Sequence, residues 1–89
     1  MATLFVRHKV ADYAKWRTAY NDFDTERKGM GVTSHGVYQM DGDPNDVTIY
    51  HEFATVEAAK AFAGSARLKG VMQAAGVQGM PDIWFANRD

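Results

Sequence analysis

TLFVRHKVADYAKWRTAYNDF (residues 3–23) reads as a strand that turns directly into a helix. Apolar side chains alternate along the strand, residues 3–9, and the inward-facing series ends on a histidine, His8. Asp12 is a good helix N-cap, and behind it four aromatic side chains share one helical face: Tyr13, Trp16, Tyr20 and Phe23. The stretch therefore predicts a strand and a following helix that packs its aromatic face against a sheet.

The rest of the chain adds three strands and a second helical region. Thr55 and Ser65 are suitable N-caps for two helical stretches, and Gly76 can end the second of them. Alternating and β-branched segments predict strands at residues 32–40, 47–53 and 82–86, with the turn DGDPND between the first two.

The resulting order of elements, β-α-β-β-α-β, is typical of a ferredoxin-like α+β domain. Short connections and right-handed crossovers favour a four-stranded antiparallel sheet in the order 4-1-3-2, with both helical regions on one face. At 89 residues the chain is expected to form one domain.

Composition excludes several classes of partner. Ten Lys and Arg residues stand against 11 Asp and Glu, without a basic run, so nucleic acid and an anionic membrane are not expected to bind. Cysteine is absent, which excludes disulfides and Cys-ligated metal. There is neither a long apolar leader nor an 18-residue apolar run, and we expect a cytoplasmic protein.

Pairing Met40 with Val47 across the turn predicts the register of the central hairpin. His35 then lies opposite Glu52, as an ion pair, and Tyr38 lies opposite Ile49. The more apolar face, expected under the helices, comprises Leu4, Val6, His8, Tyr38, Ile49, His51, Phe53, Ile83 and Phe85.

The opposite face is too apolar to be left in water on so small a monomer. Its apolar residues are Phe5, Val37, Tyr50 and Trp84, and no remaining segment can cover them. A second copy packed sheet against sheet is the simplest cover, so these four residues are predicted to form a homodimer interface.

Two segments, FVRHKVADYAKWRTAY (5–20) and VTIYHEFATVEAAKAFAGSARLKGVM (47–72), resemble the antibiotic biosynthesis monooxygenase (ABM) domain group of the dimeric α+β barrel superfamily. The resemblance extends over residues 1–89 as a single domain and implies a ferredoxin-like protomer that dimerises through its sheet. Members include cofactor-independent, quinone-forming monooxygenases, haem-degrading oxygenases and proteins without an assigned activity. Related barrels are lactone isomerases and polyketide cyclases.

Haem-degrading members carry an axial histidine in the helix that here reads AFAGS (61–65), which has none. We therefore predict no haem, and no cofactor of any other kind. A metal site is not expected either, because His8 and His51 have no third ligand on their face.

The face under the helices offers the candidate site. His8 and His51 are the predicted catalytic residues, because imidazole exchanges protons near neutral pH. The predicted walls that would bind a substrate are Trp16, Tyr20, Tyr38, Phe62 and Met72.

Three functions fit this pocket. The first is a cofactor-independent monooxygenase acting on a phenolic or polyketide-like substrate. The second is an isomerase, lyase or cyclase that uses a histidine as general acid and base. The third is a dimer that binds a small molecule without catalysis.

Overall fold

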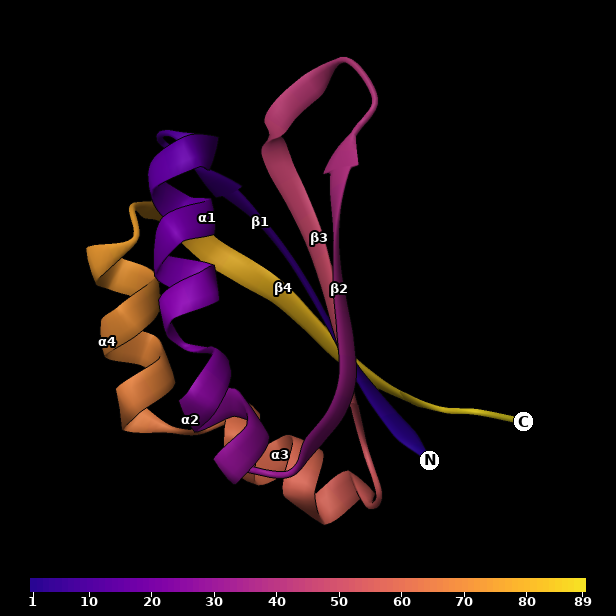
Figure 1. Ribbon diagram of the computed structural model, residues 1–89. Helices are drawn as coiled ribbons and strands as arrows, with labels where there is room; N and C mark the ends of the chain where they lie inside the picture. The colour runs from indigo at the N-terminus through magenta and orange to yellow at the C-terminus, as the bar shows by residue number, and fades with distance from the viewer.

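The computed structural model describes residues 1–89 and contains one antiparallel sheet in the order β2-β3-β1-β4. The helices α1–α4 all lie on one side of this sheet, and its other side is bare (Figure 1). This confirms the α+β, ferredoxin-like fold and the strand order 4-1-3-2. The elements are β1 Ala2–Val10, α1 Tyr13–Asp22, α2 Asp24–Gly29, β2 Val32–Met40, β3 Asp43–Phe53, α3 Val56–Ala63, α4 Ala66–Ala74 and β4 Val77–Asn87.

Side-chain caps begin three of the helices as the sequence predicts. The Asp12 carboxylate accepts from the backbone N–H groups at the start of α1, Thr55 caps α3, and Ser65 caps α4. Gly76, with φ of +86°, follows α4 in the left-handed region that favours glycine. The first helical region is divided at Phe23 into α1 and α2.

The core lies between the sheet and the helices. Its buried apolar side chains are Leu4, Val6, Val10, Trp16, Tyr20, Phe23, Val32, Val47, Ile49, Phe53, Ala59 and Phe62. Helix α4 contributes no buried residue and is the least anchored part of the helical layer. No helix of the structure has the length and the apolar character that crossing a membrane requires.

The predicted register of the β2–β3 hairpin is wrong by one residue. His35 pairs with His51 rather than Glu52, and Gln39 rather than Met40 pairs with Val47. The turn is tighter than predicted, because Gly42 has φ of +85° and Asp43 already pairs with Met40. The extra residues of β3 form a bulge that contains Pro44, which lacks the N–H that a regular ladder needs.

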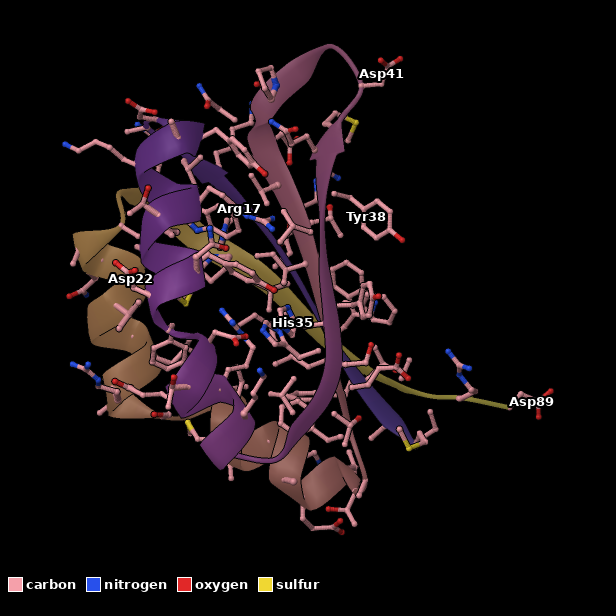
Figure 2. All side chains as sticks on the ribbon, viewed as in Figure 1. Arg17, Asp22, His35, Tyr38, Asp41 and Asp89 are labelled. Atoms are coloured by element: carbon pink, nitrogen blue, oxygen red, sulfur yellow. The ribbon has the colours of Figure 1, made fainter.

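This shift reverses the two faces of β2. Tyr38 is 64% exposed and projects from β2 away from the helices, whereas His35 lies on the side of β2 that faces them (Figure 2). Val37 packs partly buried against the core, so its predicted place on the bare face is wrong. The predicted place of Tyr38 under the helices is wrong for the same reason.

The bare face carries the remaining predicted aromatic residues. Phe5 pairs with Trp84 across β1 and β4, and their rings stack with centroids 5.4 Å apart. Tyr50 lies across Gly36, where a Cβ atom would come within 2.5 Å of the Tyr50 ring. Arg7 forms an ion pair with Asp46 on this side. Glu52 contacts Arg88, so the predicted ion pair between His35 and Glu52 is wrong.

Candidate functional site

A cavity of about 50 Å³ lies between the sheet and the helices. Its volume is well below the roughly 300 Å³ of a typical ligand pocket. It brings together six predicted site residues from β1, α1, β3, α3 and α4. The lining is Val6, His8, Trp16, Tyr20, Phe23, Arg27, Ile49, His51, Phe62, Leu68, Val71, Met72 and Ala75.

His8, at one end of this cavity, is 5% exposed. It presents its ring to Trp16 in an edge contact with centroids 5.7 Å apart, and neither ring nitrogen has a hydrogen-bond partner. Burial lowers its pKa to about 4, an effect that the charge of Asp46 partly opposes. His8 is therefore neutral near pH 7 and keeps a free lone pair.

His51 lies at the other end. It is 6% exposed, and its Nε2 accepts a hydrogen bond of 3.1 Å from Nε of Arg27, while its Nδ1 has no partner. Burial, with the nearby charge of Arg27 as a smaller cause, lowers its pKa to about 3. His51 is also neutral, but one of its nitrogens is already engaged.

Arg27 is the unexpected member of the site, because it is only 2% exposed. Its guanidinium lies 3.9 Å from the centre of the Tyr20 ring. Besides the bond to His51, it donates to the Tyr20 carbonyl at 2.7 Å and to the Asp24 carboxylate at 3.1 Å. The buried cation is therefore held by four separate contacts.

Tyr20 places its ring in the cavity lining but uses its hydroxyl elsewhere. Its oxygen and Nδ1 of His35 form a short hydrogen bond, and Nε2 of His35 lies 3.2 Å from the Asp24 carboxylate. Since that carboxylate can only accept, His35 donates from Nε2 and accepts the Tyr20 proton at Nδ1. Tyr20 therefore offers its ring, and not its hydroxyl, to a bound molecule.

The pairing of β1 with β3 sets the distance between the two histidines. His8 pairs with Val47 and His51 pairs with Leu4, so they lie four residues apart along the strands, roughly 13 Å at 3.3 Å per residue. Trp16 and Tyr20 stack above this interval, with centroids 5.1 Å apart.

A second hollow adjoins the cavity beneath α4. This groove has a volume of about 370 Å³ and is lined by residues of α4, β1 and β4 and by Ala63 at the end of α3. It shares Val6, Leu68 and Met72 with the cavity, and two of these side chains belong to α4. The partition between the two spaces is therefore carried by the least anchored helix.

The structure adds two residues that sequence reasoning missed. Arg27 continues the helical face of Tyr20 and Phe23, at the i+7 and i+4 positions. A charged residue on a helical face that is otherwise aromatic is the sequence feature that could have identified it. His35 was assigned to the wrong face through the register error. The lining includes His8, Trp16, Tyr20, His51, Phe62 and Met72 but not Tyr38. No group of three His, Cys, Asp or Glu side chains is arranged to hold a metal ion.

Comparison with known proteins supports the fold. No family model matches the chain, and no curated protein sequence matches it. Among solved structures, a candidate antibiotic biosynthesis monooxygenase from Bordetella bronchiseptica is similar with a TM-score of 0.83 and 12% identity, covering 99% of this chain and 96% of that one.

SnoaB, a cofactor-independent oxygenase from Streptomyces nogalater, is similar with a TM-score of 0.80 and 11% identity, over 99% of this chain and 92% of SnoaB. A further antibiotic biosynthesis monooxygenase gives a TM-score of 0.76 and 8% identity, over 100% of this chain and 99% of that chain. At such identities the likeness establishes an ABM-like fold. The expected resemblance to ABM structures is confirmed at that level.

Proposed function

We propose that this chain forms a cytoplasmic homodimer whose cavity binds a planar, phenolic or polyketide-like molecule, which it oxidises as a cofactor-independent monooxygenase. One observation carries the proposal: three buried imidazole nitrogens, on His8 and His51, lie in the lining of a largely apolar cavity without any partner in the protein. Buried polar atoms are normally hydrogen-bonded, because an unpaired one costs about 1–3 kcal/mol.

The lining of the cavity suits a flat, largely apolar ligand. Trp16 and Tyr20 provide stacked aromatic surface above it, and Val6 and Ile49 line it from the strands below. A ring system needs more than the present 50 Å³, and displacement of Leu68 and Met72 would join the cavity to the adjacent 370 Å³ groove.

The proposed chemistry needs a base and molecular oxygen. A neutral histidine removes an acidic proton from the substrate, and the electron pair left on the substrate reduces O₂. In the net reaction a methylene group becomes a carbonyl group, one oxygen atom enters the product, and the other leaves as water with the two hydrogens. The fold shared with SnoaB supports this choice among the reactions that a histidine could catalyse.

Dithranol, a dihydroxyanthrone, is a suitable probe because it has both an acidic methylene and a phenol. We expect the protein to bind it and to accelerate its conversion to the quinone with uptake of O₂, and His8→Gln to lose at least about 100-fold in kcat/KM. Lys60→Gln, an exposed change on α3, is the control. Proton exchange or product formation without oxygen would instead indicate an isomerase or cyclase, and binding without turnover would indicate a non-catalytic dimer.

The homodimer is proposed from the bare face of the sheet. Phe5, Tyr50 and Trp84 gather there as predicted, and Tyr38 replaces Val37 as the fourth apolar side chain. Trp84 is 44% exposed in the single chain, so a large area of aromatic surface faces water. A two-fold contact through this face should bury at least about 1,000 Å².

A further inference from the structure

We infer that Arg27 fixes His51 as a hydrogen-bond donor, so that His8 is the base of the site and His51 holds the oxygen on which negative charge develops. The roles of His8 as base and of His51 in binding the oxygen rest on the proposed function, whereas the effect of Arg27 on His51 does not. It assigns different tasks to two histidines that the sequence treats alike.

The argument begins with the bond between Arg27 and His51. A guanidinium has five N–H donors and no acceptor, so Nε2 of His51 must accept in the 3.1 Å bond from Nε of Arg27. A neutral imidazole carries one hydrogen, which must then sit on Nδ1. That Nδ1–H is buried in the lining of the cavity and has no acceptor.

Charge around the two rings supports the same division. A proton added to His51 would displace the Arg27 bond and place a second cation beside a guanidinium that is itself buried. His8 has no such neighbour. The charge that acts on His8 is the carboxylate of Asp46, which favours the protonated ring.

Arg27 is itself held in place, as a positioning residue must be. Asp24 and the Tyr20 carbonyl accept from its two terminal nitrogens, which leaves Nε directed to His51. The Tyr20 ring packs against the guanidinium plane. The tautomer of His51 is thus set by a fixed donor, and a mobile side chain would leave both tautomers populated.

The division of roles defines the chemical class of the ligand. It has an acidic O–H or C–H bond that reaches His8 and, toward the other end, an oxygen that accepts from Nδ1–H of His51. His8 takes the proton, the bonding pair stays on the ligand, and conjugation places the negative charge on the oxygen beside His51. A compound with only a donor group at the His51 end is disfavoured.

The first test needs no ligand. Long-range proton–nitrogen correlation NMR on the full chain near pH 7 reports the tautomer of each of the three histidines, which His8→Gln and His35→Gln variants assign. We expect His51 as a single neutral tautomer protonated at Nδ1. Protonation at Nε2, or a mixture of the two tautomers, would overturn the inference.

The second test changes the donor. Arg27→Lys keeps a cation but loses the planar Nε–H, so we expect the pure Nδ1–H signature of His51 to become a mixture. Arg67→Lys is the matched control, because Arg67 pairs with Glu26 at the surface. An unchanged His51 signature in Arg27→Lys would contradict the role of Arg27, and if that variant fails to fold, the wild-type spectrum alone decides.

The third test separates base from donor, using dithranol. Asparagine carries its amide N–H close to the position of histidine Nδ1, so His51→Asn should lose no more than about tenfold in kcat/KM, while His8→Asn should lose at least about 100-fold. The reverse order would overturn the division. If the wild-type chain does not bind dithranol, the proposed function fails, and the tautomer measured without ligand still decides the role of Arg27.

Discussion

The two faces of the sheet both carry side chains that their surroundings do not suit, and the mismatch has opposite character on each. Under the helices, His8 and His51 are buried among apolar groups with three nitrogens that no protein atom pairs. On the bare face, Trp84 and Tyr38 expose aromatic surface to water. The covered face therefore needs a small molecule whose polar groups can pair with these nitrogens, and the bare face needs an apolar protein surface broad enough to cover it.

The largest expected effect concerns the bare face. Trp84→Asp should abolish the dimer or unfold the chain, because it places a charge in an apolar interface. Sedimentation velocity measures the result. Lys60→Asp, an exposed change on α3, is the control and should leave the assembly unchanged. A Trp84→Asp protein that remained a stable dimer would remove the reason to regard this face as an interface.

A smaller effect is expected from pH on the covered face. Burial lowers the pKa of His8 to about 4 and that of His51 to about 3, below the value near 6.5 of an unfolded chain. Between the folded-state pKa of each histidine and about 6.5, the unfolded chain binds more protons than the folded chain. The free energy of unfolding should therefore fall as the pH drops from about 6.5, by up to about 1.4 kcal/mol per pH unit for each histidine.

Urea denaturation between about pH 7 and pH 4.5 measures this slope. His8→Gln should remove roughly half of it, because His8 and His51 are the two most strongly affected groups. His35→Gln should remove less, since His35 is partly exposed and bonded to Asp24. A slope that His8→Gln leaves intact would mean that the His8 ring is hydrated in the folded state.

The smallest effect sharpens the description of the bare face. Gly36→Ala should cost about 1 kcal/mol or somewhat more, because the new Cβ would lie 2.5 Å from the Tyr50 ring, which must move. Gly70→Ala, in α4 with nothing within 4 Å of the added carbon, should instead gain about 0.5–1 kcal/mol. Thermal unfolding compares the two variants. If both changed the free energy of unfolding in the same direction, the packing of Tyr50 against Gly36 would be contradicted.

The fold was largely predictable because local signals agree with each other. Asp12, Thr55 and Ser65 cap helices at the predicted positions, and β2 begins and ends at the predicted residues. The register of β2 against β3 was not predictable from the length of the segment between the strands. A tight turn at Gly42 followed by a bulge replaces the expected six-residue loop. A one-residue slip is enough to move a whole strand's side chains to the other face.

The site was predictable in the parts that depend only on periodicity. His8 and His51 follow from alternation within single strands, and Trp16 and Tyr20 follow from helical spacing. Arg27 did not follow, because periodicity places a residue on a face but gives no partner for a buried charge. The partner here is an imidazole on a strand 24 residues away in sequence.

Helix α4 has a consequence for timescale. None of its side chains is buried. Its backbone amide hydrogens should therefore exchange with solvent, through local opening, far more readily than those of β1 or β3. The side chains of Leu68 and Met72 move with it. Entry of a molecule into the cavity would then depend on the rate at which α4 frays and reforms, and variants that change global stability elsewhere would leave that rate almost untouched.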